Sequence, residues 1–246
     1  MAETVSLTAR SGLSWQIASA IGTRIVNGEY APGDVLPTES DLGEAYNVGR
    51  SAVREAIKML ASKGLVDARP RRGTIVCERN AWSFLDADLL SWLEGSAPDQ
   101  EFLLELVDMR MAIETEAAAL AAGRSVAQEV KEIRAAYEKM VAAEIGQADP
   151  IAADLEFHKA IVSASGNRFM RPLVAIVSTA LRFSFRYTNA LAGAHVGDLE
   201  EHERILLAIE AGDAEGARAA VRSLLQSVRD AVERGGQKNS DGLEQT

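Results

Sequence analysis

Apolar residues recur at helical spacing in the first third of the chain, and turn-forming residues separate the helical segments. Three isoleucines stand four positions apart within residues 14–27, which predicts an amphipathic helix. The turn-forming residues GEYAPGD end this helix. A short second helix is expected after Thr38, with acidic residues in its first turn, and a third helix over about residues 50–63.

The segment after the third helix has the alternation of a β-hairpin. Residues 66–77 read VDARPRRGTIVC, in which strand-like residues flank a turn at Pro70–Gly73. Three short helices followed by a two-stranded hairpin predict a winged helix-turn-helix. Cys77 ends an apolar run, so we expect it to fill space in the core and not to act as a catalytic thiol.

From about residue 87 onward the pattern is helical, with six or seven segments and no convincing strand. SGN at 165–167 and AGD at 211–213 separate helices, and Ser125 with Gln128 three residues later has the signature of a capping box. This part predicts an all-α bundle large enough to hold a ligand. The polar, glycine-containing end GGQKNSDGLEQT predicts disorder.

The fold class expected from these patterns is mainly α, with an N-terminal winged helix-turn-helix and a C-terminal all-α helical bundle. The expected divisions are a winged helix-turn-helix over residues 1–79, a linker and connecting helix over 80–95, the bundle over 96–234 and a disordered tail over 235–246.

The charge is unevenly distributed along the chain. The net charge is −10, but residues 50–79 hold 8 Lys/Arg against 3 Asp/Glu, whereas residues 80–246 hold 16 against 27. A compact basic segment in an acidic protein indicates a nucleic-acid surface.

The third helix carries much of this basic charge on one face. Arg50, Arg54 and Lys58 fall at positions i, i+4 and i+8, on a different face from the apolar Val53 and Ile57. Such a helix can present guanidinium groups to the DNA major groove, and the arginine-rich hairpin tip RPRRG suits the minor groove or the backbone. A solvated basic helix is the alternative, and the order of the elements favours DNA.

A second chemical pattern lies in the bundle. In DLEFHKAI, Asp154 and His158 stand one helical turn apart and therefore on one face. This arrangement is half of a metal site, although an isolated Asp–His pair is more often a buried structural hydrogen bond.

Two blocks of the sequence resemble a known family of bacterial regulators. GEYAPGDVLPTESDLGEAYNVGRSAVREAIKMLASKGLVDARPRRGTIV resembles the DNA-binding domain of the GntR family. The motifs R.AIE..AA.LAA at 110–122, D...FH.AI..ASGN at 154–167 and EH..IL.AI..GD...A at 201–217 resemble the effector-binding (FCD) domain of its FadR-like subfamily. Together the matches cover nearly the whole chain.

The resemblance implies a homodimer that binds palindromic double-stranded operator DNA. The residues that correspond to the family's DNA contacts are Arg50, Ser51, Arg54, Arg72 and Gly73. Some members carry a further basic contact in the second helix, where this chain has Ser40.

The resemblance also implies a divalent metal in the bundle, held by one aspartate and three histidines. Asp154, His158 and His202 match the first three ligands, but the fourth position holds Leu224. Three ligands can still bind Zn²⁺ or a similar metal and leave one position open for water or an effector oxygen. The alternative is a site that has lost its metal and keeps a structural Asp–His pair.

An effector of the organic-acid class is implied as well. Arg110 matches an arginine of the family's effector pocket, and an ion pair with Glu114 or Asp108 on the helix surface is its alternative role. Ser178 and Arg182 are further candidates because they are polar residues in an apolar helix. The stretch RNAWSFLDADLLSWL at 79–93 is similar to that of members that control sugar-acid catabolism, which implies an aldonate such as D-galactonate. Its aromatic residues Trp82, Phe84 and Trp92 are expected to pack the two domains together.

The functional expectation is a transcriptional repressor that a carboxylate effector releases from its operator. We also expect a cytoplasmic protein without a membrane partner. The start MAETVSLTAR lacks a signal-peptide core, no apolar run is long enough to span a membrane, and one cysteine allows no internal disulfide. The alternatives are a metal-dependent enzyme in a helical bundle, and a regulator that responds to metal alone or to another organic acid.

Overall fold

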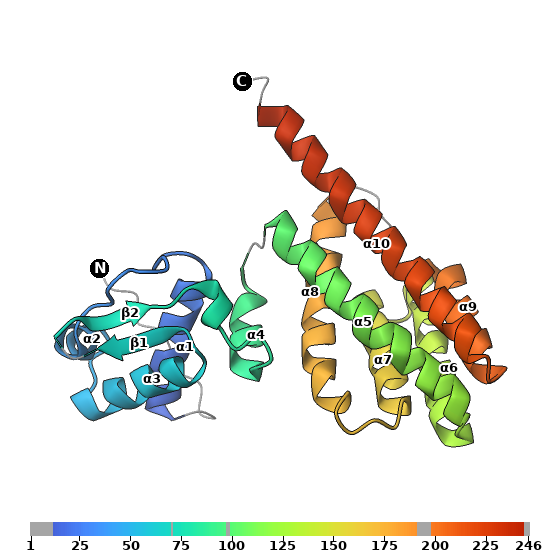
Figure 1. Cartoon of the computed structure of the whole chain (residues 1–246), viewed down its shortest axis with the longest axis horizontal. Helices are drawn as coiled ribbons and strands as arrows, with labels where there is room; N and C mark the ends of the chain where they lie inside the picture. The colour runs from blue at the N-terminus through green and yellow to red at the C-terminus, as the bar shows by residue number, and fades with distance from the viewer. Residues whose placement is uncertain (1–11, 70, 97–98, 191–197, 244–246) are drawn as a thin grey trace. The chain divides into compact units, whose positions relative to one another are not determined.

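The computed structural model describes residues 12–69, 71–96, 99–190 and 198–243. The chain divides into two compact units, Met1–Ala97 and Pro98–Thr246. Each unit has its own set of packed elements (Figure 1).

The first unit is a winged helix-turn-helix, as the sequence predicts. Its elements are α1 (Leu13–Val26), α2 (Glu39–Ala45), α3 (Arg50–Ser62), β1 (Val66–Arg69) and β2 (Gly73–Val76). The two strands are antiparallel and pair from Val66 with Val76 to Arg69 with Gly73. Helices α1 and α3 pack against each other through buried residues that include Ile17, Ile21, Val53 and Leu60.

The N-terminus of α2 is closed by a capping box. The Thr38 hydroxyl accepts a hydrogen bond from the Asp41 backbone N–H, and the Asp41 carboxylate accepts one from the Thr38 backbone N–H. The box satisfies two backbone donors that a helix start leaves without intrahelical partners. It fixes the start of α2, the helix that precedes α3.

A short helix at the end of the first unit packs on α1. This helix is α4 (Ala87–Leu93), which follows the 3₁₀ turn Arg79–Ala81. The buried indole of Trp92 lies against Gly22 of α1, where a β-carbon would collide with the ring. Lys63 donates to Asp86 at 2.7 Å and to Asp88 at 2.6 Å. These contacts make α4 part of the first unit.

The aromatic residues before and within α4 are also accounted for inside this unit. Trp82 is buried, donates its indole N–H to the Cys77 carbonyl at 3.1 Å, and lies 6.0 Å from the Phe84 ring between centroids. These contacts of Trp82 and Trp92 lie within the first unit, and the packing of the two domains by the aromatic residues stays a prediction. Cys77 is half-buried.

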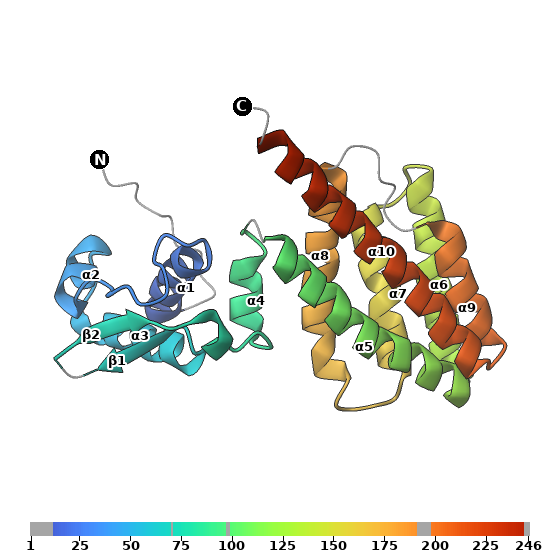
Figure 2. The same cartoon turned by 45° about the horizontal axis from the view of Figure 1, so that its top comes forward.

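The second unit is an all-α bundle. Its helices are α5 (Gln100–Arg124), α6 (Ala127–Glu144), α7 (Pro150–Ala164), α8 (Val174–Ala190), α9 (Leu199–Glu210) and α10 (Ala214–Leu243), with a 3₁₀ turn at Arg171–Leu173. Helix α10 runs along α5 and also packs on α9, and α7 lies against α5 and α6 (Figure 2). In the described residues from Ala87 onward, seven α-helices and no strand confirm the predicted pattern.

Aspartates begin three of these helices, but the capping box expected at Ser125 is not formed. Asp99, Asp149 and Asp198 each accept hydrogen bonds from backbone N–H groups at the starts of α5, α7 and α9. Ser125 instead closes α5 in a left-handed conformation, with φ 47°, and Val126 is the N-cap of α6, which has no side-chain capping hydrogen bond. Only two residues separate α5 from α6, so Ser125 terminates one helix and cannot also cap the next.

Helix α10 extends into the stretch for which the composition predicts a tail. Helix α10 continues to Leu243 through most of residues 235–246, for which the composition predicts disorder. Once a helix is formed, each added residue gains one backbone hydrogen bond, and no proline interrupts this stretch.

Among the described helices, none combines the length and apolar composition that crossing a membrane requires.

The candidate site lies in the core of the bundle. Phe157 of α7, Ile205 of α9 and Leu224 of α10 belong to one buried apolar cluster. Alanines of α5, among them Ala117 and Ala121, are also buried in it, and their small side chains let neighbouring helices approach closely. The polar residues Asp154, His158 and His202 are buried on the same helices as these apolar side chains.

Candidate metal centre and nucleic-acid interface

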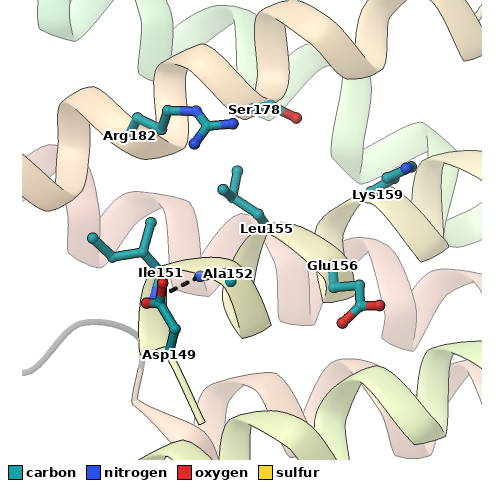
Figure 3. Close-up of a pocket in the computed structure, with 8 residues that line it drawn as sticks. All are labelled: Asp149, Ile151, Ala152, Leu155, Glu156, Lys159, Ser178 and Arg182. Atoms are coloured by element: carbon teal, nitrogen blue, oxygen red, sulfur yellow. Dashed lines mark hydrogen bonds between the residues drawn. The ribbon is translucent and has the colours of Figure 1, made fainter. Parts of the chain in front are cut away.

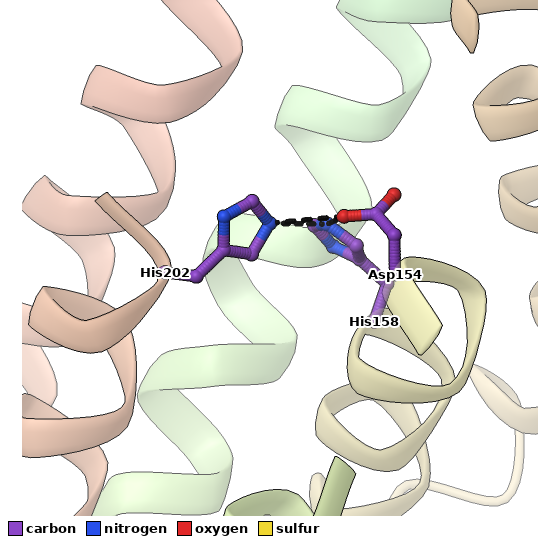
Figure 4. A group of neighbouring side chains, drawn as sticks. All are labelled: Asp154, His158 and His202. Atoms are coloured by element: carbon purple, nitrogen blue, oxygen red, sulfur yellow. Dashed lines mark hydrogen bonds and ion pairs between the residues drawn. The ribbon is translucent and has the colours of Figure 1, made fainter. Parts of the chain in front are cut away.

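Three side chains from two helices converge inside the bundle. Asp154 and His158 lie one turn apart on α7, and His202 reaches them from α9 (Figure 4). Asp154 Oδ1 is 3.1 Å from His202 Nε2 and 3.6 Å from His158 Nε2, and the two Nε2 atoms are 3.3 Å apart. All three residues are at most 4% exposed. The structure therefore brings together the three predicted metal ligands.

The hydrogen bonds on the outer side of each imidazole determine which nitrogen faces this cluster. His202 Nδ1 lies 3.0 Å from the backbone carbonyl of Asp198, which can only accept a hydrogen bond. Nδ1 therefore donates this hydrogen bond, and Nε2 of His202 faces the cluster. His158 Nδ1 contacts the Glu114 carboxylate of α5 in the same way. Both histidines are thus arranged to present Nε2.

Electrostatics keep the carboxylates of this group ionised. Burial alone would raise the pKa of Glu114, but Arg110 and His158 outweigh it and lower the pKa to about 2. The pKa of Asp154 is likewise lowered, against the effect of burial, by the two histidines. For His158, burial is outweighed by Glu114 and Asp154, which raise its pKa to about 9.

This arrangement requires a cation. Two imidazole lone pairs and a carboxylate oxygen within hydrogen-bonding distance repel one another unless a proton or a metal ion lies among them. In the protein without metal, the carboxylates of Glu114 and Asp154 facing the His158 ring raise its pKa and so favour its protonated form. One oxygen and two imidazole nitrogens are also a donor set that suits Zn²⁺ and related divalent ions, so the residues fit the expected metal.

Helix α5 contributes a buried ion pair behind His158. Arg110 Nε donates to Glu114 Oε1 at 2.6 Å, and both side chains are about 2% exposed. Sequence analysis allowed a pair between these residues on the helix surface, but the structure buries it. One terminal nitrogen of Arg110, Nη2, is buried without a hydrogen-bond partner in the described structure, as is the Thr115 hydroxyl.

Glu114 is the functional candidate that the sequence analysis missed. The sequence indicates only an ion pair with Arg110, whereas the second carboxylate oxygen of Glu114 contacts His158, which is 44 positions away. The i, i+4 spacing from Arg110 predicts the ion pair, but no local spacing predicts the contact with α7.

Leu224 is the residue that the family resemblance places at the fourth ligand position. It is 3% exposed and belongs to the same apolar cluster as Phe157. The Phe157 ring lies edge-on to both imidazoles, with centroid distances of 5.7 Å to His158 and 5.2 Å to His202. One side of the cluster is therefore apolar, and among the described residues no fourth side chain joins the three ligands. The remaining histidine of the chain, His195, lies outside the described residues.

The other two effector candidates lie elsewhere in the bundle. Ser178 and Arg182 of α8 line an open groove of about 360 Å³ against α7 (Figure 3). The remaining lining residues are Asp149, Ile151, Ala152, Leu155, Glu156 and Lys159. Neither Arg110 nor any of the three metal-ligand candidates lines it. The candidate effector residues therefore occupy two separate places, a buried network and a surface groove.

The predicted DNA contacts lie on the surface of the first unit. Arg50, Ser51 and Arg54 are exposed on α3, whose opposite face is buried. Arg54 pairs with Glu39 of α2 at 3.1 Å, and the Arg50 guanidinium lies 3.5 Å from the Ser40 hydroxyl. These contacts connect the third helix to the second, so the basic side chains are held in position while they remain open to solvent.

The hairpin tip presents a second exposed basic group. Arg72 and Gly73 are exposed at the turn, and Gly73 has a φ of +82°, a conformation that favours glycine. A β-carbon at this position would lie 3.0 Å from a methyl carbon of Val35. The glycine therefore allows the tight turn that exposes the neighbouring arginine.

Comparisons with known proteins match both units. The model of bacterial regulatory proteins of the gntR family matches residues 13–76, and the FCD domain model matches residues 105–227. The chain is 33% identical to an uncharacterized HTH-type transcriptional regulator, YieP, of Escherichia coli (strain K12), over 90% of this chain and 96% of that protein. It is 29% identical to the galactonate operon transcriptional repressor of the same organism, over 86% and 93% of the two chains.

A solved structure shares the fold. The structure of Lar, described as controlling the expression of the Listeria monocytogenes agr system, matches with a TM-score of 0.60 and 18% sequence identity. The match covers 92% of this chain and 99% of that one. At this identity the likeness supports the two-part architecture alone.

Proposed function

The chain belongs to the GntR family of bacterial regulatory proteins and carries an FCD domain, and from this premise we propose that it represses a sugar-acid catabolic operon. Its class is that of DNA-binding transcriptional regulators and not of enzymes. The proposal adds a homodimeric state, an operator of palindromic double-stranded DNA, a divalent metal and a carboxylate effector that releases the operator.

The DNA part of the proposal rests on the surface of α3 and the hairpin. Arg50, Ser51 and Arg54 suit the major groove, where arginine bonds guanine edges and phosphates. Arg72 and Gly73 suit the adjacent backbone or minor groove. The pair between Arg54 and Glu39 is exposed, so exchanging the glutamate for a DNA phosphate or base exposes no buried charge.

The convergence of Asp154, His158 and His202 carries the metal part of the proposal. These side chains would hold the ion, and Zn²⁺ suits their oxygen and nitrogen donors. When bound, the ion supplies positive charge and a coordination position for an anionic oxygen. Because Leu224 provides no fourth donor, that position is available to water or to a carboxylate or hydroxyl of the effector.

Two observations support a sugar acid as the effector. The unpartnered Nη2 of Arg110 belongs to the same hydrogen-bonded network as His158, and a carboxylate is the usual partner of a buried guanidinium. One relative at 29% identity is a galactonate operon repressor. D-Galactonate offers both a carboxylate and an adjacent hydroxyl, so it matches an arginine beside a metal with an open position.

Release then follows from a difference in effector affinity between two states of the protein. An effector that binds the DNA-free state more tightly by a few kcal/mol lowers operator occupancy substantially. We propose that the helices of the bundle shift when the effector binds, and that the segment from Trp82 to Trp92 passes the change to the winged helix. Trp92 and Lys63 hold α4 to the first unit, so a displacement of α4 would act on that unit directly.

The first experiment measures binding of the purified protein to a fluorescent duplex from the region upstream of its own gene. We expect salt-sensitive binding that a duplex of scrambled sequence does not reproduce. D-Galactonate should weaken it, and stripping with a chelator should remove the effect of galactonate. Unchanged DNA binding at saturating galactonate would contradict release by this sugar acid.

Thermal melting separates the two candidate effector positions. A ligand at about 100 times its Kd adds about 2.7 kcal/mol of stability, which raises Tm by a few degrees. If the ligand binds the buried network, the rise persists in Arg182→Ala and disappears when metal is removed. A rise that Arg182→Ala abolishes would instead place the ligand in the groove between α7 and α8.

One different regulatory input is also supported by a specific observation. Asp154, His158 and His202 converge within one buried cluster, which makes the metal itself a candidate signal. This second proposal requires that Zn²⁺ changes operator affinity, while neither D-galactonate nor a short α-hydroxy acid such as L-lactate changes it further.

A further inference from the structure

We infer that Glu114 is a positioning residue for the metal site, because it fixes the ring tautomer through which His158 presents Nε2. The inference rests on the proposed function in one respect, that Asp154, His158 and His202 bind a metal. It assigns a role to a residue of α5 that lies outside the three ligands.

Both carboxylate oxygens of Glu114 have defined partners. Oε1 accepts the Nε hydrogen bond of Arg110 at 2.6 Å, and Oε2 contacts Nδ1 of His158. An ionised carboxylate can only accept hydrogen bonds, so Nδ1 of His158 must be the donor. The proton is thereby held on the nitrogen that faces away from the cluster, and Nε2 is available to the metal.

Arg110 determines the orientation of this carboxylate. It stands one helical turn before Glu114, and its guanidinium occupies Oε1 inside the bundle. If the Glu114 carboxylate moved away from this position, it would leave a buried guanidinium without its partner. Arg110 and Glu114 thus hold the outer nitrogen of His158 through a series of hydrogen bonds. The backbone carbonyl of Asp198 does the same for His202.

A purely structural role for Glu114 predicts a different effect of its replacement on metal affinity. If the carboxylate only neutralised Arg110, its replacement by a neutral isostere would change stability but leave the metal affinity of the folded protein unchanged. If it positions His158, Glu114→Gln changes the affinity itself. The NH₂ group of the glutamine must point either at Arg110 or at His158 Nδ1. Pointed at Arg110, it places two hydrogen-bond donors against each other. Pointed at His158 Nδ1, it selects the tautomer with the proton on Nε2, the atom that faces the metal.

The test measures Zn²⁺ affinity of the full chain by competition with a chromophoric chelator, after metal has been removed. We expect Glu114→Gln to bind roughly 10–100-fold more weakly than the wild type, which is the range for outer partners of metal-bound histidines. Glu116→Gln is the matched control, because Glu116 lies on the same helix and pairs with Arg218 at the surface. It removes the same charge and should leave the affinity unchanged.

Each outcome has a separate meaning. A folded Glu114→Gln that binds Zn²⁺ as tightly as the wild type overturns the inference and leaves the metal site standing. A wild type that binds no Zn²⁺ overturns the metal part of the proposed function instead. Glu114→Asp, which keeps the charge but is one methylene shorter, should give an intermediate loss.

A measurement on the unsubstituted protein keeps the inference testable if these variants do not fold. In the Zn²⁺-loaded wild type, nitrogen NMR of the imidazoles should show His158 with a protonated Nδ1 and a metal-bound Nε2. Coordination through Nδ1 would overturn the inference, because Nδ1 is the atom assigned to Glu114.

Discussion

Two arginine–glutamate pairs, one in each unit, show how burial changes the role of the same two residue types. Arg54 and Glu39 lie 3.1 Å apart on the surface of the first unit, with side chains 64% and 38% exposed. Arg110 and Glu114 lie 2.6 Å apart within the bundle, and both side chains are 2% exposed. Water can replace either partner of the first pair and neither partner of the second.

The consequence is a division between exchange and positioning. An exposed arginine can leave its glutamate for a phosphate at little cost, so Arg54 can hold a defined position and still contact DNA. A buried pair that loses one partner leaves an uncompensated charge, so Arg110 and Glu114 hold each other in place. The first arrangement suits a surface that binds and releases DNA, and the second suits the support of a metal ligand.

The largest effect is expected from breaking the buried pair. Arg110→Ala should lower the free energy of unfolding by about 3–5 kcal/mol, because the Glu114 carboxylate loses its partner in the interior. Urea denaturation of the metal-free proteins measures the difference. Arg218→Ala, which removes an arginine paired with Glu116 nearer the surface, should cause a clearly smaller loss. Equal losses in the two variants would contradict the distinction between the pairs.

The pH dependence of the metal-free protein provides the next effect. The pKa of His158 is raised from 6.5 to about 9, so its contribution to stability is fully present below pH 6.5 and is lost as the pH rises through 9. The pKa of Glu114 is lowered from 4.5 to about 2, so its contribution is present above pH 4.5 and is lost as the pH falls toward 2.

Stability without metal should therefore be greatest between about pH 4.5 and 6.5 and fall by on the order of 1–3 kcal/mol toward pH 9. Urea titrations with a chelator present measure this fall. Zn²⁺ should reverse it, because metal replaces the proton and competes better at high pH. A metal-free protein that is equally stable at pH 6 and pH 9 would contradict the protonated state of His158.

Restoring the fourth ligand tests the apolar side of the site. Leu224→His should bind Zn²⁺ more tightly than the wild type in chelator competition, because a third imidazole completes the ligand set. Without metal it should lose about 1–3 kcal/mol, because a polar ring replaces a buried apolar side chain. If the open position serves the effector, the variant should also respond less to D-galactonate. Unchanged Zn²⁺ affinity would place Leu224 away from the ion.

The smallest stability effect is expected at the exposed pair. Arg54→Ala should leave the urea midpoint nearly unchanged, because the pair is open to water. Operator affinity, measured by fluorescence anisotropy, should fall roughly tenfold or more, because the substitution removes a groove contact. Arg134→Ala is the control, since it removes an exposed arginine of the bundle that pairs with Glu210. An equal loss of DNA affinity in both variants would indicate general charge and not a contact by α3.

Local patterns were sufficient for the elements and for half of the metal site. The spacing of apolar residues predicts α1 and α3, and the alternation around the Pro70–Gly73 turn predicts the hairpin, because these features depend on the residue's own neighbours. The i, i+4 spacing likewise predicts that Asp154 and His158 share a face of α7. The resemblance to a family supplied His202 and the gap at Leu224, which spacing alone does not reveal.

Only the packing of the bundle brought the remaining parts together. Three features depend on how the helices are placed and capped. They are the contact of Glu114 with His158, the separation of Arg182 from Arg110, and the hydrogen bond of His202 Nδ1 to the backbone carbonyl that precedes α9. Ser125 is a similar case. Its sequence has the signature of a capping box, but it forms the C-cap of α5 and does not cap α6. Helical periodicity specifies which residues share a face, and burial in a common core specifies which faces meet.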